Sequence, residues 1–228
     1  LQAVSRTTPA ELSLKASGNS RKININELAL TIDKIAKLRT TGSVSNPTDS
    51  RKLAAELNLR GELTGGDVVA RRLGVVPASL RIPRISLAAD ARYAASTLNA
   101  KLRGTADGGK IVADGSWNMR ADKSNADIRL SNFDVRSIMP AGSVGAVSGM
   151  LTADVKGFDL YSMNGRMSCR IDSVAVADQT LHDINAEALI ADGNVELMAY
   201  SMCPGMAFDL SLTGSIAPDV YDIKLESN

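Results

Sequence analysis

Apolar and polar residues alternate with a period of two along much of the 228-residue chain. Leu98, Ala100 and Leu102, for example, alternate with Asn99, Lys101 and Arg103. This alternation is typical of strands with one apolar and one solvated face, as in antiparallel sheets. It predicts strands around residues 12–16, 53–60, 98–103, 111–119, 126–130, 151–156, 184–190, 195–199, 208–212 and 221–225. Residues 81–90 and 170–178 resemble each other, and an alternating strand follows each of them.

Short polar sequences between these segments indicate turns. Asp107-Gly108-Gly109, Asn164-Gly165 and Asp192-Gly193 have the composition of tight hairpin turns. Residues 28–36 fit helical spacing as well as strand alternation, and we interpret them as a strand because the equivalent stretch before Gly115 alternates. Residues 140–149 are rich in glycine and small residues, and we expect a flexible connector there.

One pattern occurs three times. The triplets Gly42-Ser43-Val44, Gly115-Ser116-Trp117 and Gly214-Ser215-Ile216 each precede a polar loop that carries an aspartate, and a strand-like segment follows each loop. The loop aspartates are Asp49, Asp122 and Asp219. The pattern predicts that one kind of β-hairpin is used three times.

Two further segments resemble each other. Residues 67–73 and 134–139 each begin with an aspartate suited to cap a helix, and a proline follows each segment, Pro77 or Pro140. We expect one or two helical turns in each. We expect the repeats to divide the chain into residues 1–79, 80–141, a connector at 142–149, and a truncated third repeat at 150–228, all within one continuous elongated β domain. We interpret the chain as an excised segment of a longer protein.

Composition narrows the function. The net charge of +1 gives no electrostatic basis for binding nucleic acid, and no apolar run reaches the length of a membrane-spanning helix. Hydrophobic residues make up 44% of the chain but aromatic residues only 4%, so the apolar surface is mainly aliphatic. Cys169 and Cys203 are compatible with a disulfide or, as we favour, with two buried free thiols.

The sequence offers little catalytic chemistry. His182 is the only histidine, and no Gly-x-Ser-x-Gly nucleophile turn accompanies it. Cys169, His182 and Cys203 lack metal-ligand spacing, and the Asp-Gly pairs are ordinary turns rather than calcium loops. We therefore expect no enzyme activity, no cofactor and no metal.

The apolar strand faces are the candidate site. They fit either a closed sandwich or barrel core, or an open trough that holds acyl chains, at roughly 0.8 kcal/mol per buried methylene. The residues expected to line such a trough are Leu102, Ile111, Trp117, Ile128, Leu130, Leu151, Val155, Ile171, Ile184, Ile190, Leu197, Phe208, Leu210 and Ile223.

Three motifs resemble AsmA-like proteins, the envelope proteins of Gram-negative bacteria that include the translocation and assembly module TamB. They are Asn-Phe-Asp-Val-x-x-Ile-Met-Pro at 132–140, Gly-Met-Leu-Thr-Ala-Asp-Val-Lys-Gly at 149–157, and the recurrent Leu-x-x-x-Gly-Ser. The resemblance implies a periplasmic β-rich segment of a protein anchored in the inner membrane, with an aliphatic groove for phospholipid and, for TamB, an outer-membrane barrel partner.

Together these observations predict an all-β, elongated, twisted antiparallel sheet that is curled into a groove and carries one or two short helices. The expected function is passive transport of phospholipid acyl chains between the inner and outer membranes. Two alternatives stay open. The chain could be an assembly scaffold for outer-membrane or secreted β-proteins that acts by strand addition at an open edge, or a structural, adhesin-like sandwich.

Overall fold

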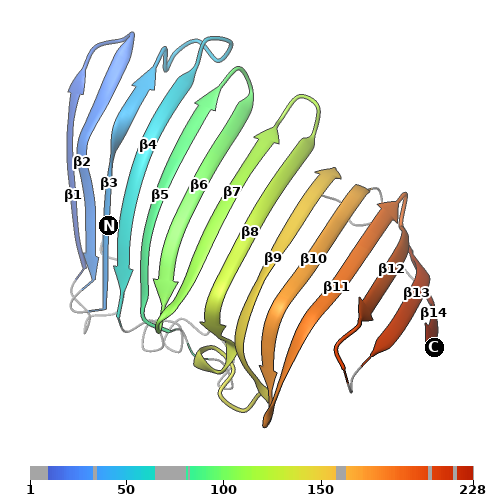
Figure 1. The fold of residues 1–228 in the computed structure, drawn as a ribbon. Helices are drawn as coiled ribbons and strands as arrows, with labels where there is room; N and C mark the ends of the chain where they lie inside the picture. Colours follow the sequence, from blue (N-terminus) through green and yellow to red (C-terminus); the bar gives the residue numbers. More distant parts are fainter. Residues whose placement is uncertain are drawn as a thin grey trace.

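The computed structural model describes residues 10–32, 35–64, 81, 83–157, 163–204, 207–217 and 220–227 and confirms the predicted all-β class (Figure 1). Fourteen strands form one sheet in the order of the chain, and neighbouring strands are antiparallel. The strands are β1 (Ala10–Gly18), β2 (Lys22–Ile32), β3 (Ala36–Ser45), β4 (Ala54–Leu63), β5 (Ile85–Ala94), β6 (Thr97–Ala106), β7 (Gly109–Asn118), β8 (Lys123–Asp134), β9 (Val144–Lys156), β10 (Asn164–Val176), β11 (Gln179–Ala191), β12 (Asn194–Ser201), β13 (Phe208–Ala217) and β14 (Val220–Ser227).

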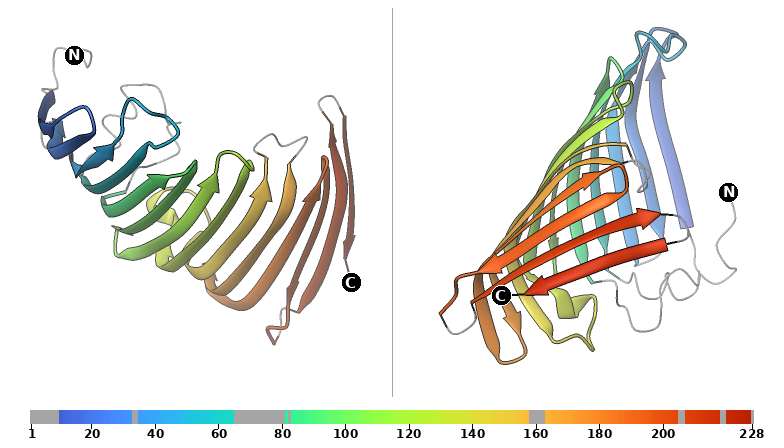
Figure 2. Two further views of the ribbon diagram at one scale, coloured as in Figure 1. Left: turned by 90° about the horizontal axis from the view of Figure 1, so that it is seen from above. Right: turned by 90° about the vertical axis from the view of Figure 1, so that its right-hand side faces the viewer.

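The sheet is open, twisted and bowed. Strands β1 and β14 lie at its two edges and are not paired with each other. Seen from the side, the strands turn from nearly upright at the blue end to nearly horizontal at the red end (Figure 2), as the right-handed twist of strands requires. Seen from above, the middle strands bow toward the viewer of Figure 1, so the opposite face is on the inside of the curve.

Tight turns hold the successive strands together. Asp107 and Gly108 join β6 to β7 with φ angles of 43° and 92°, and Asp192 and Gly193 join β11 to β12 with φ angles of 48° and 78°. Two successive positive φ angles are the geometry that favours Asp-Gly in two-residue hairpins. Both predicted turns are therefore confirmed.

The turn expected at Asn164-Gly165 is wrong, because these residues begin β10. Gly165 pairs with Val155 of β9, and a Cβ added to it would lie 2.4 Å from the carbonyl oxygen of Asp154. The glycine is thus needed for the close approach of two strands and not for a positive φ angle.

The three Gly-Ser triplets lie in β3, β7 and β13, and each strand forms a hairpin with the strand that follows. The prediction that each triplet belongs to a β-hairpin is therefore confirmed. The strand interpretation of residues 28–36 is also confirmed for the described part, because β2 runs to Ile32 and β3 begins at Ala36.

One of the two expected helices can be compared with the structure. Val135–Ser137 form a single 3-10 turn, η1, and the Asp134 carboxylate accepts a hydrogen bond of 3.1 Å from the backbone N–H of Arg136. The predicted aspartate cap is confirmed. The other expected helix, at residues 67–73, lies outside the described residues.

The expected flexible connector at 142–149 is wrong from Val144 onward, because β9 begins there and pairs with both β8 and β10. Gly149 lies between Leu130 and Ile171 in the ladder, and its backbone is buried. A Cβ at this position would lie 2.4 Å from the carbonyl oxygen of Arg170. The glycines of this segment permit close strand packing rather than flexibility.

Replacing Gly149 with alanine should therefore destabilise the sheet by about 1–3 kcal/mol, because the backbone of β10 must move to admit the methyl group. Gly104→Ala is the matched comparison, since its added Cβ would lie 3.1 Å from the nearest atom, the Ser86 carbonyl oxygen. Urea unfolding monitored by far-UV circular dichroism should show the larger loss at Gly149. An equal or larger loss at Gly104 would contradict the tight β9–β10 contact.

Candidate functional site

The strand register brings the fourteen predicted lining residues to one face of the sheet. Residues directly opposite one another in an antiparallel ladder share a face. Leu102 pairs through Ala113 with Ile128, and Ile128 pairs with Leu151, so these positions form one continuous row. The other predicted residues fall in parallel rows, and Ile223 is placed by its backbone pairing with Gly214. We call this side of the sheet the apolar face.

Four rows cross the middle of the apolar face at right angles to the strands. The first two run through Leu59, Ala89, Leu102, Ala113, Ile128, Leu151, Cys169, Ala186, Ala199 and Leu210, and through Leu38, Gly61, Leu87, Gly104, Ile111, Leu130, Gly149, Ile171, Ile184, Ser201 and Phe208. The other two run through Leu57, Ala91, Ala100, Gly115, Ala126, Ala153, Met167, Ala188, Leu197 and Leu212, and through Tyr93, Leu98, Trp117, Ser124, Val155, Gly165, Ile190 and Val195. No Asp, Glu, Lys, Arg or His lies in these rows, so the face is continuously uncharged.

The apolar face extends further than the sequence prediction, which began at Leu102. Leu12 and Leu14 of β1 pair with Leu30 and Leu28 of β2, and the rows continue from there through β3 to β5. The two β1 leucines are 61% and 63% exposed. The alternation of apolar and polar residues in the first hundred residues could have predicted this extension.

No second layer covers the apolar face within the described residues, where each strand packs against its neighbours in the sheet. Only Ala106, Phe133, Val174 and Ile190 are buried among the described hydrophobic residues. The accessible surface of 15329 Å² exceeds the roughly 10,000 Å² expected of a compact monomer of this mass. The described sheet therefore has an open apolar face rather than a closed sandwich core.

A short fifth row lies at one end of the apolar face. Phe133, Val147, Val174 and Leu181 lie opposite one another on β8 to β11. Register shifts between Leu130 and Phe133 of β8 and between Ile171 and Ser173 of β10 separate this row from the others. Asn132 and Asp183, which lie at the level of these shifts, have φ angles of 50° and 54°. Phe133 and Val174 are only 9% and 7% exposed. We call these four residues the bulge row, and it is the nearest approach to a core in this region.

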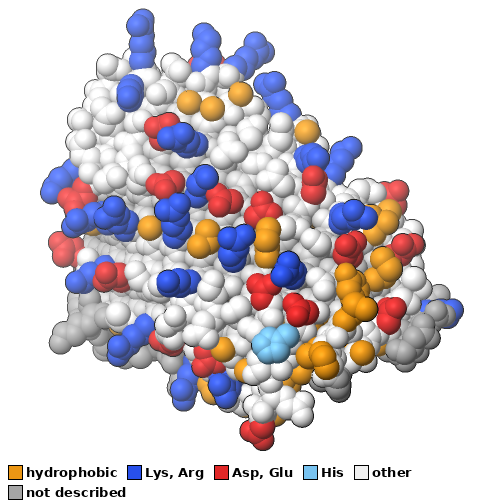
Figure 3. All heavy atoms as spheres, viewed as in Figure 1, with side chains coloured by type: hydrophobic (Ala, Val, Ile, Leu, Met, Phe, Trp, Pro, Cys, Tyr) orange, Lys and Arg blue, Asp and Glu red, His pale blue; other side chains and the backbone are white. Residues whose placement is uncertain are grey.

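The opposite face carries the charged side chains, as Figure 3 shows in the view of Figure 1. Exposed hydrophobic side chains, among them Leu189, Met198 and Tyr200, also lie on this face over β11 and β12. Ion pairs join many of its charges across neighbouring strands. Lys101 lies 3.2 Å from Asp114 and Arg92 lies 3.5 Å from Glu56, measured between the charged nitrogen and oxygen atoms. Such exposed pairs contribute little to stability, about 0–1 kcal/mol each. We call this side the charged face.

Two cations share the Glu27 carboxylate on the charged face. Its Oε2 accepts a hydrogen bond of 3.0 Å from Lys15 Nζ, and its Oε1 lies 3.3 Å from Arg39 Nε. The hydrogen bond and charge of Lys15, with the charge of Arg39, lower the pKa of Glu27. The carboxylate therefore stays ionised and shared between two cations down to more acidic pH than an isolated glutamate.

The two cysteines and the single histidine of the sequence have separate environments. Cys169 and Cys203 are free thiols, and Cys169 lies on the apolar face, where burial raises its pKa. His182 is exposed on β11, with Nδ1 3.3 Å from the carbonyl oxygen of Asp172. Among the described residues, no group of three His, Cys, Asp or Glu side chains is arranged to hold a metal ion. The described part of the chain also has no helix of sufficient length and hydrophobicity to cross a membrane.

Comparison with protein-family models, with curated proteins and with solved structures finds no match to this chain. The resemblance to AsmA-like proteins therefore rests on the sequence motifs alone.

Proposed function

We propose that the apolar face is a passive conduit for the acyl chains of phospholipids. The observation that carries this proposal is a continuous, uncharged face on the inside of a bowed sheet, with no second layer over it in the described residues. Apolar patches larger than a few hundred Å² are rare on soluble monomers unless something binds them. A ligand that is itself apolar and elongated matches this surface.

The chemistry of the face suits acyl chains better than shaped ligands. Its rows consist mainly of Leu, Ile, Val, Ala and Gly, and aromatic residues make up only 4% of the chain. Aliphatic side chains contact a methylene chain without demanding a fixed geometry, and burial of each methylene is worth roughly 0.8 kcal/mol. The rows run across all the middle strands, so a chain could move along the sheet without meeting a charge. The charged face would meanwhile remain in water.

The cellular setting follows from the sequence resemblance and belongs to the same proposal. We infer a periplasmic segment of a protein anchored in the inner membrane of a Gram-negative bacterium, with an outer-membrane barrel protein as a partner. Transport of phospholipid between the two membranes would then be passive, and no bond would be made or broken.

A second function has one observation in its favour. The edge strands β1 and β14 each have one side without a partner strand in the described sheet. An exposed edge can accept a strand of another chain, so the protein could serve as an assembly scaffold for outer-membrane or secreted β-proteins. On this alternative the apolar face would hold no lipid.

Lipid analysis of the purified chain tests the proposal. The protein should be produced in the periplasm of a Gram-negative host, purified without detergent, extracted with chloroform and methanol, and analysed by mass spectrometry. We expect at least one phospholipid per chain. An extract that holds no phospholipid, from protein with an intact β-sheet spectrum, would overturn the conduit and leave the scaffold.

A further inference from the structure

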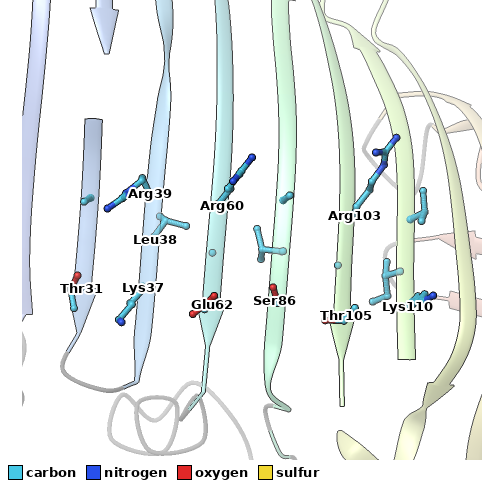
Figure 4. A pocket seen from close by; sticks show the side chains of 17 residues that line it. Thr31, Lys37, Leu38, Arg39, Arg60, Glu62, Ser86, Arg103, Thr105 and Lys110 are labelled. Carbon is cyan, nitrogen blue, oxygen red and sulfur yellow. The ribbon is translucent and has the colours of Figure 1, made fainter. Parts of the chain in front are cut away.

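A hollow of about 790 Å³ crosses the charged face over β2 to β7 (Figure 4). Two rows of side chains form its walls, and the floor is the backbone of residues whose side chains leave on the apolar face. Strand β5 contributes only Ser86 and Ala88 to the walls, and these small residues leave the middle of the hollow open. The hollow therefore forms where small side chains of β5 lie between longer side chains of the neighbouring strands, and it lies on the opposite side of the sheet from the apolar face.

The lining of the hollow is strongly basic although the chain as a whole is nearly neutral. Five cations, Lys37, Arg39, Arg60, Arg103 and Lys110, line it together with a single carboxylate, Glu62. The net charge of the whole chain is only +1. The hollow lies in the basic part of the chain, since residues 1–110 carry 18 Lys and Arg against 9 Asp and Glu.

Few charges of the hollow are paired. Some cations elsewhere on the charged face, such as Lys101 and Lys123, each lie 3.2 Å from an aspartate of the neighbouring strand. Within the hollow only Arg39 makes an ion pair with a described residue, and it shares Glu27 with Lys15. Arg60 and Arg103 have no ion pair within the described ranges, which leaves their guanidinium groups available to a ligand.

The positions of Arg60 and Arg103 are a second sign of a ligand. These two arginines lie in one row of the charged face, on either side of Ala88 of β5. Figure 4 shows both extending in the same direction from their strands, whereas Arg39 of β3 extends the other way, toward β2 and its partner Glu27. Because Arg60 and Arg103 make no ion pair with a described residue, an anion held between them would supply the missing countercharge.

We propose that this hollow binds a ligand that carries at least two phosphate groups. Guanidinium groups match phosphate oxygens with paired hydrogen bonds. Arg60 and Arg103 are two strands apart, about 10 Å at the backbone, and their long side chains, with that of Lys110, would hold neighbouring phosphates of one ligand between them. The phosphates could belong to lipid headgroups at an anionic membrane surface or to a soluble phosphate compound. The proposal does not depend on the conduit, because it concerns the opposite face.

Titration with inorganic tripolyphosphate at low ionic strength tests the site, followed by isothermal calorimetry. We expect saturable binding at one site per chain. Arg60→Gln combined with Arg103→Gln should weaken it by at least about tenfold, the equivalent of about 1.4 kcal/mol. Lys123→Gln combined with Arg166→Gln removes the same charge from the same face outside the hollow and should change the affinity by less than about twofold.

A second experiment, with phospholipid vesicles, distinguishes lipid headgroups from a soluble phosphate compound as the ligand. If vesicles of phosphatidylglycerol bind the protein, tripolyphosphate displaces it from them, and Arg60→Gln with Arg103→Gln abolishes the binding, the ligand is a membrane headgroup. If tripolyphosphate binds and these vesicles do not, the ligand is a soluble phosphate compound. Absence of saturable tripolyphosphate binding, or equal losses in the two double variants, would overturn the proposal whichever face carries lipid.

Discussion

Replacing Leu130 with aspartate should reduce photocrosslinking of the chain to a photoactivatable phospholipid by at least about tenfold, a loss that needs only about 1.4 kcal/mol of binding free energy. Leu130 lies on the apolar face between Ile111 and Gly149. A carboxylate there would have to lose water for an acyl chain to pass, and an unpaired charge is costly to desolvate. Because water reaches the face from its open side, the sheet itself should keep its far-UV β spectrum.

Ser131→Asp is the matched control for this experiment. Ser131 is the next residue of β8, is exposed, and lies opposite Lys110 on the charged face. The same carboxylate is added one position along the strand but on the other side of the sheet, so crosslinking should be unchanged. If Leu130→Asp unfolds the protein while Ser131→Asp does not, the apolar face is a sealed core and the conduit proposal fails. If both variants fold and crosslink equally, lipid does not use this face.

The period-two alternation was sufficient to predict the faces of the strands. Leu151, Ala153 and Val155 alternate with polar residues in the sequence, and the ladder places them on the apolar face. This succeeded because side-chain direction in a strand depends on local parity and is kept until a bulge intervenes. The Asp-Gly turns were equally readable, because two successive positive φ angles restrict the residues that can occupy them.

The role of each glycine was harder to predict, because glycines in turns and glycines at close strand contacts occur in similar sequences. Gly193 provides a positive φ angle in a turn, whereas Gly149 and Gly165 permit close contact between strands. Only the partner across the ladder distinguishes these roles, and that partner is distant in sequence. This is why residues 144–149 were expected to be a connector and Asn164-Gly165 a turn.

The open state of the apolar face was not predictable from alternation either. A sandwich core and an open trough need the same one-sided strands, and they differ in whether a second layer packs on them. The register shifts after Leu130 of β8 and Ile171 of β10, beyond which Phe133 and Val174 are buried, also left no clear pattern in the sequence. These register shifts and the burial beyond them depend on contacts among the four strands β8 to β11, which no single strand sequence reveals.

Burial in the bulge row leads to the largest stability effect that we expect. Phe133→Ala should lower the free energy of unfolding by about 3 kcal/mol, since a large side chain that is only 9% exposed leaves a cavity when it is removed. Leu151→Ala, on the open part of the apolar face, should cost about 1 kcal/mol, because a half-exposed side chain loses less burial and leaves no enclosed space. Urea unfolding measured by circular dichroism gives both values.

The comparison of these two variants also tests the openness of the sheet without any lipid. Both residues lie on adjacent strands β8 and β9, far in the strand order from the edge strands β1 and β14, so fraying of the edges does not enter. Surface exposure and side-chain size are the main variables between them. A loss at Leu151 as large as that at Phe133 would mean that the apolar face is covered in solution. Because a covered face cannot carry acyl chains, that single result would count against the conduit as strongly as an empty lipid extract.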